Sequence, residues 1–218
     1  MNELLSKVIP LALGAAVSPA VLTAIVLILG GRRAIARGAV FTAGVFTVLI
    51  GLTLSGLLIT HRSDPSAARV QITHDVYGLL GVVLLSLAII SLLRSRTHSD
   101  TGTPVHTSNP ETSTGLLAVF GLGFGLMISN LSTILLFLPA MHSVSESSVS
   151  TASKAIAVLI TLAITSIPVT VPMLLRICLP RRSAPIFGAI NRFVTGHQRA
   201  ITITVEIGFG LYLIYRAL

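Results

Sequence analysis

Six apolar runs constrain the fold of this 218-residue chain more than any other feature. An α-helix rises about 1.5 Å per residue and the hydrocarbon core of a bilayer is about 30 Å thick, so about 20 apolar residues cross it. The runs are Leu4–Leu29, Gly38–Thr60, Val76–Leu93, Gly115–Met141, Ala152–Ile177 and Ala200–Ala217. They predict an all-α, polytopic membrane protein with six transmembrane helices.

Composition agrees with this class and excludes several others. Charged residues make up 10% of the chain, against about 25% in a typical soluble domain. The single cysteine, Cys178, excludes an internal disulfide and a cysteine-rich metal site. The histidines are scattered, and we find neither a catalytic set nor a phosphate-binding loop, so we expect no metal, no cofactor and no enzyme activity.

The basic residues are distributed unequally between the links. The net charge of +8 comes from residues in short links rather than from one basic face, which argues against nucleic-acid binding. Links after the first, third and fifth runs hold most of the Lys and Arg, and such links stay cytoplasmic. The pattern predicts a multi-pass protein of the cytoplasmic membrane with both termini outside. The residues expected inside are Arg32, Arg33, Arg37, Arg94, Arg96, Arg176, Arg181, Arg182, Arg192 and Arg199; those expected outside are Lys7, Arg62, Arg69, Lys154 and Arg216.

The chain divides into two halves around a polar segment. Residues 94–114 are rich in Ser, Thr and Pro and are predicted to form a flexible cytoplasmic linker. Residues 1–93 and 115–218 then hold three spans each, and because three is odd, related halves would form two inverted three-helix repeats. In the last inner link, the apolar spacing of residues 186–193 fits a short amphipathic helix on the inner leaflet. An ordinary basic loop is the alternative.

The first run is interrupted by the stretch "LGAAVSPAVLT". Pro19 lacks an N–H group, so the carbonyl of Ala15 loses its helical partner, and in lipid such a group needs another donor. Ser18 and Thr23 supply hydroxyls nearby, and Gly14 allows a close approach by another backbone or a ligand. We interpret this stretch as a discontinuous helix.

The fourth run carries a similar interruption. Gly125 and Ser129 repeat the spacing of Gly14 and Ser18, and Asn130 and Thr133 follow. Asn130 offers two donors and an acceptor, and we expect it to face Ser18 and the freed carbonyl across the two halves. Paired discontinuous helices indicate a transporter site near the midplane. The plainer alternatives are a proline bend and a packing hydrogen bond.

Two further features extend the candidate site. Pro168 and Pro172, one turn apart with Thr170 between them, predict an unwound segment in the fifth run that acts as a hinge, a cavity wall or only a static kink. Glu206 is the acid well inside a predicted span, and such acids suggest an ion or proton role. Its expected partner is Arg176, with Arg199 as the second choice. The alternatives are a neutral Glu206 and a position at headgroup level.

These features resemble a known family. The stretches "LALGAAVSPAVLTAIVLIL", "SIPVTVPMLL" and "INRFVTGHQRAITITVEIGFGLYLIYRAL" are similar to the sulfolipid-1-addressing and glycopeptidolipid-addressing proteins (the GAP family) of the lysine-exporter superfamily. Relatives often carry Asn-Pro-Lys in the second half, where this chain has Asn130-Leu131-Ser132 and lacks the lysine. The resemblance implies a membrane protein that moves a glycolipid or another envelope lipid to the cell surface.

We therefore expect a lipid exporter that works by alternating access and contacts its substrate at both interruptions and the proline segment. One alternative is an exporter of a small polar solute such as an amino acid or cation. Another is a non-transporting scaffold for a lipid-export complex. The expected partners are the bilayer and the substrate, with a homodimer or envelope-lipid export machinery permitted by the small-residue helix faces.

Overall fold

The computed structural model describes residues 2–31, 33–61, 68–93, 115–180 and 183–217, and the expected linker of residues 94–114 lies outside them. Within these ranges the secondary structure is helical, without strands. The helices are α1 (Asn2–Ala16), α2 (Pro19–Gly30), α3 (Ala34–His61), α4 (Ala68–Leu93), α5 (Leu116–Ile128), α6 (Leu131–Glu146), α7 (Thr151–Thr165), α8 (Ile167–Cys178) and α9 (Ser183–Ala217).

Three of the expected spans are bent pairs of helices. The first is α1 with α2, bent by 57°, the fourth is α5 with α6, bent by 70°, and the fifth is α7 with α8, bent by 68°. Among the described residues, one unbroken helix, Ala34–Leu57, is long and apolar enough to cross a membrane, and up to four spans result if each pair counts as one. The structure thus supports a membrane protein but does not by length and composition confirm six spans.

Each bend has a local cause in the sequence. Pro19 and Pro168 lie in the first turn of α2 and α8, where a missing N–H group does no harm. The bend between α5 and α6 has no proline; there the Asn130 side chain accepts from the Thr133 N–H and starts a new helix. The fifth run bends at Ser166, while Pro172 continues inside α8, so the expected unwinding between the two prolines is corrected to a break just before them.

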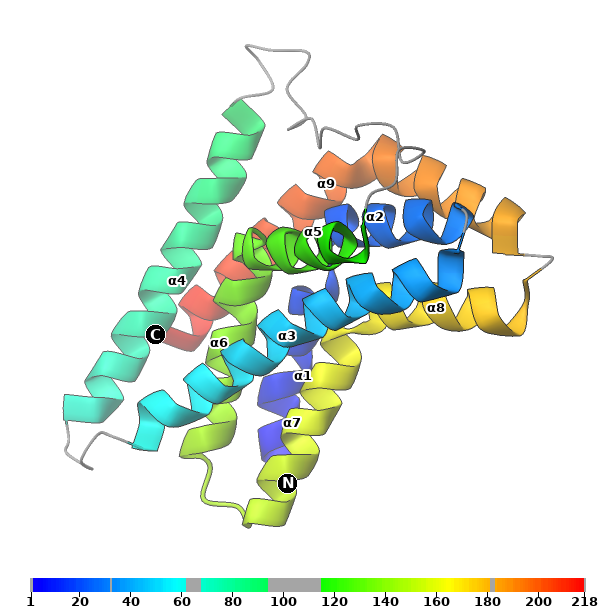
Figure 1. Cartoon of the computed structure of the whole chain (residues 1–218). Coiled ribbons are helices and arrows are strands. Elements are labelled where there is room, and N and C mark those ends of the chain that lie inside the picture. The colour runs from blue at the N-terminus through cyan, green and yellow to red at the C-terminus, as the bar shows by residue number, and fades with distance from the viewer. Residues whose placement is uncertain (1, 32, 62–67, 94–114, 181–182, 218) are drawn as a thin grey trace.

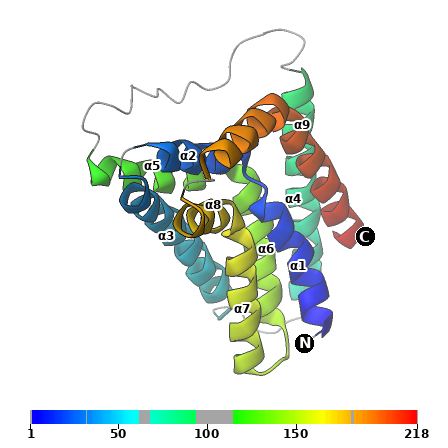
Figure 2. The same ribbon diagram turned by 90° about the vertical axis from the view of Figure 1, so that its right-hand side faces the viewer.

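The bent pairs divide the molecule into upright and transverse helices (Figure 1). Helices α2 and α5 lie across the upper part and α8 crosses below them at mid-height, while α1, α6 and α7 extend toward the lower end, as the view in Figure 2 also shows. The second part of α9 packs beside α4 at one flank, where α4 runs upward and α9 downward in Figure 1, whereas the first part of α9 lies across the upper end. Each bent pair contributes one helix to each group, so the three bends lie where the transverse helices meet the upright ones.

Helix α9 joins two elements expected to be separate. One continuous helix runs from Ser183 to Ala217, so the amphipathic stretch and the sixth span form a single element. Phe187 and Val194 on its first part are buried against the protein, whereas Phe193 is exposed. The predicted helix is therefore present, in place of the alternative loop, but Phe193 does not share the buried face with Phe187; its position on the inner leaflet stays a prediction.

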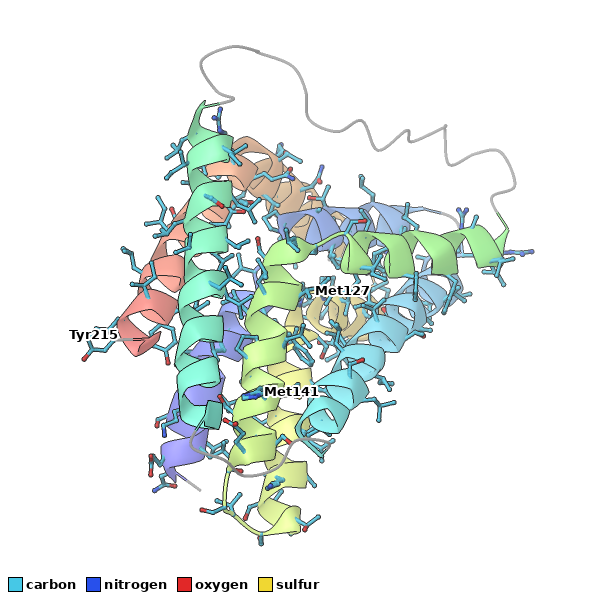
Figure 3. All side chains as sticks on the ribbon, turned by 90° about the vertical axis from the view of Figure 1, so that its left-hand side faces the viewer. Met127, Met141 and Tyr215 are labelled. Atoms are coloured by element: carbon cyan, nitrogen blue, oxygen red, sulfur yellow. The ribbon has the colours of Figure 1, made fainter. Side chains whose placement is uncertain are left out.

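Close helix contacts depend on glycine. A Cβ on Gly123 of α5 would collide with the backbone oxygen of Phe41 on α3, and one on Gly44 of α3 would collide with that of Phe120. Without Cβ atoms, the two helices approach closely enough for backbone-to-backbone packing, which drives association in lipid where apolar burial does not. Buried Met127 lies near the corner between α5 and α6 and buried Met141 farther along α6, while Tyr215 points outward (Figure 3).

Replacing Gly123 by Ala should destabilise the protein by about 1–3 kcal/mol, because the added methyl group meets backbone that cannot rotate away. The measurement is the thermal unfolding midpoint in detergent. Gly121→Ala, on the same helix, is the matched control because a Cβ there meets nothing within 4 Å. Equal midpoints for the two variants would contradict the close α3–α5 contact.

Candidate functional site

The first and second helix breaks meet in space. The side-chain amide of Asn130, between α5 and α6, donates a hydrogen bond of 2.6 Å to the hydroxyl of Ser18, between α1 and α2. These residues are 112 positions apart in the sequence. The expected contact between Ser18 and Asn130 is observed.

The carbonyl freed by Pro19 has a partner in the opposite break. Thr133, in the first turn of α6, donates its hydroxyl proton to the Ala15 oxygen at 3.0 Å. The Thr133 backbone N–H in turn donates to the Asn130 side-chain oxygen at 3.2 Å. Thr133, rather than Asn130 as expected, therefore pairs the carbonyl, which leaves the Asn130 amide for Ser18.

The backbone geometry of the two breaks is equivalent, but the equivalent residues are not the ones that the Gly-x-x-x-Ser motif aligns. They differ from that alignment by one position. The N–H of Leu22 bonds the oxygen of Ser18 at 3.0 Å, and the N–H of Ile134 bonds the oxygen of Asn130 at 3.2 Å. Ser18 and Asn130 therefore both precede the second helix of their pair. Ser129 instead ends α5, so Asn130, and not Ser129, corresponds to Ser18.

The site is buried on one side and open on the other. Ser18 and Thr133 are buried, with 7% and 1% of their surface exposed. The residues beside Asn130 are open: Ile128 is 51% exposed and Leu131 is 46% exposed. The paired polar groups therefore lie directly behind an apolar surface.

The two glycines of the predicted motif have different surroundings. A Cβ on Gly14 would lie 2.6 Å from the ring of Phe209 and 2.8 Å from the side chain of Leu136. Gly14 therefore serves helix packing between α1, α6 and α9. A Cβ on Gly125 meets nothing within 4 Å, so this glycine borders open space.

The third break, between α7 and α8, satisfies its backbone carbonyls with hydroxyl groups from the same two helices. The hydroxyl of Thr170 donates to the Ser166 oxygen at 3.0 Å, and the Ser166 hydroxyl donates to the Ala163 oxygen at 3.0 Å. Pro168 begins α8 and Pro172 is buried inside it. The buried Thr165 hydroxyl has no hydrogen-bond partner among the described residues, which leaves one polar group available at this break.

Glu206 on α9 reaches the second break, which corrects its expected pairing. Its Oε1 atom accepts a hydrogen bond of 3.3 Å from the hydroxyl of Ser132. Arg176 instead donates from Nη1 to the Ser183 hydroxyl at 2.9 Å and to the Pro180 oxygen at 3.3 Å. Glu206 is therefore joined to the first turn of α6 rather than to the inner end of α8.

Sequence reasoning missed the role of Ser132, because a serine two positions after Asn130 gives no sign of which helix it faces. Thr23 was expected at the site, and its hydroxyl on α2 is buried without a partner in the described part of the chain.

Together the breaks offer amide and hydroxyl donors and acceptors and one carboxylate. Across the described ranges, no group of three His, Cys, Asp or Glu side chains is placed to hold a metal ion.

The apolar helices, the bent pairs and the polar groups paired between them define the class as a helical membrane protein. The chain belongs to the family described as Sap, sulfolipid-1-addressing protein, whose model matches residues 8–218. The resemblance to the sulfolipid-addressing proteins is thereby confirmed over essentially the whole chain, and the family name indicates a lipid-addressing function. Searches of curated proteins and of solved structures give no match.

Thr133→Val should destabilise the protein by about 1–3 kcal/mol, because the Ala15 carbonyl would be left unpaired in a buried place. Thermal unfolding in lipid nanodiscs measures the loss. Thr53→Val is the matched control: Thr53 is also buried, but its hydroxyl bonds the Leu49 oxygen within its own helix. A loss for Thr133→Val no larger than that for Thr53→Val would contradict the cross-break bond.

Proposed function

We propose that this protein moves a glycolipid or another amphipathic envelope lipid out of the cytoplasmic membrane by alternating access, with the lipid headgroup at the paired breaks. The observation that carries the proposal is the Asn130–Ser18 hydrogen bond at 2.6 Å, which joins the two interrupted helices. Discontinuous helices place unpaired backbone and side-chain groups where a transported polar group can bind. A headgroup hydroxyl would replace this bond with bonds of its own, and the two breaks would separate.

The surroundings of the breaks favour a lipid over a small solute. Ile128 and Leu131 flank Asn130 and are about half exposed, so acyl chains have an apolar surface beside the polar groups. A carrier for amino acids would need charged partners for both the amino and carboxyl groups, since buried charges must be paired. The hydrogen bonds that join the breaks come from uncharged Ser, Thr and Asn side chains, and Glu206, bonded to Ser132, is the one charged group that reaches them among the contacts described. The family name, which describes lipid addressing, points the same way.

Contacts between the halves support an inverted repeat of three spans each. Gly81 on α4 would place a Cβ 2.8 Å from Ile214, and Gly210 on α9 would place one 2.9 Å from Leu85. Each glycine thus packs on the residue four positions after the other glycine, as a two-fold axis between α4 and α9 requires. Helix α3 covers 28 residues, and α7, Ser166 and α8 together cover the same length. Both features fit six spans of the lysine-exporter type.

Asn130→Leu should slow lipid movement at least about fivefold, because the variant lacks the amide that would bond the headgroup, and one hydrogen bond of about 1 kcal/mol changes an equilibrium constant by about that factor. The assay follows a headgroup-labelled glycolipid in proteoliposomes with an impermeant quencher. Ser55→Ala is the control, since its hydroxyl is exposed and bonds the Gly51 oxygen in its own helix.

Movement at the wild-type rate in Asn130→Leu would remove the breaks from the mechanism. Labelled amino acids are the second substrate in the same vesicles. Their transport without lipid movement would favour the solute exporter, and transport of neither would favour a scaffold.

Orientation is tested with the native cysteine. Cys178 is exposed at the end of α8, beside the basic link proposed to be cytoplasmic. An impermeant maleimide added to intact cells should label Cys178 only after permeabilisation. Ser148→Cys in a Cys178→Ser background should react directly, because Ser148 is exposed in the link between α6 and α7. The reverse pattern would invert the proposed topology.

A further inference from the structure

Glu206 is a buried carboxylate that takes no part in the hydrogen bonds between Ser18, Asn130, Thr133 and Ala15, where the lipid headgroup is proposed to bind. It is 5% exposed, and within the described part of the chain its Oε2 atom has no hydrogen-bond partner. Leaving such an atom unpaired in an apolar place is costly unless it carries a proton or binds a ligand. Acids inside membrane spans mark ion or proton pathways for this reason.

The helices around Glu206 offer it no cation among the residues that the structure describes. Helix α9 packs on α1, α2, α4 and α8 and bonds α6 through Ser132. Helix α2 and the described side chains of α4 have no titratable group. On α1, Lys7 pairs with Glu3 at 2.8 Å, and on α6, His142 lies 3.4 Å from Glu146.

The charged or titratable groups on α8 and α9 are engaged elsewhere or lie toward the ends of these helices. Arg176 of α8 bonds Ser183 and Pro180, and Arg199 of α9 bonds the oxygen of Leu92 at 3.4 Å. The remaining titratable groups with described side chains on these two helices are Cys178, Arg192, His197, Tyr212 and Tyr215.

One hydrogen bond connects Glu206 to the residues that hold the breaks together. Ser132, which donates to Glu206, lies between Asn130 and Thr133 in the first turn of α6. Asn130 bonds Ser18, and Thr133 bonds the Ala15 oxygen. A change in the strength of the Ser132 bond therefore acts on the turn that closes both breaks.

We propose that Glu206 binds and releases the proton whose movement drives or gates lipid export, an inference that rests on the proposed function. The Ser132 hydroxyl donates to Glu206 at 3.3 Å, and an ionised carboxylate accepts such a bond more strongly than a neutral acid does, so ionisation favours the closed arrangement of the first turn of α6. A proton added to Oε2 neutralises the group and weakens that bond. The turn is then free to move away from Ser18, and release of the proton restores the closed arrangement.

A proton fits this place better than a metal cation. Hard cations such as Ca²⁺ and Mg²⁺ take about six or more oxygen ligands. The described contacts of Glu206 supply one carboxylate and one hydroxyl. A proton needs only the unpaired Oε2 atom.

Infrared difference spectroscopy during a pH titration tests proton binding directly. Wild-type protein in lipid bilayers should show the band of a protonated carboxyl group that appears and disappears with pH, and the isosteric Glu206→Gln variant should lack it. Glu146→Gln is the control, because Glu146 is an exposed acid on α6. A band that persists unchanged in Glu206→Gln would overturn the proposal.

Coupling is tested in the proteoliposomes. A pH gradient should change the wild-type rate of lipid movement severalfold, and a sodium gradient should not. Glu206→Gln should move lipid without responding to the pH gradient, and Ser132→Ala should keep the infrared band but lose the response. An equal response in Glu206→Gln, or a response to sodium alone, would overturn the proposal. If wild-type protein moves no lipid, the proposed function and the coupling both fail, while the infrared titration still decides whether Glu206 binds a proton.

Discussion

The structure depends on the requirement that backbone polar groups be paired where water is excluded. Pro19 removes one helical donor, and the Ala15 oxygen is satisfied by the hydroxyl of Thr133 from the other half of the chain. The interruption of one helix is therefore stable only when the second interrupted helix lies against it. The Asn130–Ser18 bond adds a second connection at the same point, so the two breaks are one structural unit.

Close packing by small residues sets the positions of the helices around this unit. Backbone approaches at Gly123 bring α3 against α5, and the contacts of Gly81 and Gly210 bring α4 against α9. Gly14 has the same role under Phe209, although its place beside a break predicted a close approach by another backbone or a ligand. Apolar burial contributes little to helix association in lipid, so these steric fits and the polar bonds between helices carry specificity.

The proposed mechanism depends on the two hydrogen bonds between the breaks, Asn130 to Ser18 and Thr133 to the Ala15 oxygen. They hold the breaks together, and they are few enough for a lipid headgroup to replace them. In that proposal a headgroup would compete for the amide and hydroxyl groups, and acyl chains would contact the apolar residues beside Asn130, which are exposed. Glu206 is connected to the same turn through Ser132, and the further proposal is that its charge alters how firmly that turn is held. Substrate binding and proton binding would act on one element, which is the condition for coupling them.

Much of the fold was predictable from the sequence alone, because apolar run length, proline and glycine act locally. All six runs coincide with helices or bent pairs, and the interruptions at Pro19 and Asn130 lie where expected. The sequence did not reveal that Thr133 pairs the Ala15 oxygen, that Asn130 rather than Ser129 matches Ser18, or that Glu206 meets Ser132 instead of Arg176. Those partners lie 74 to 118 positions apart, and only the crossing of the packed helices decides which polar groups face one another.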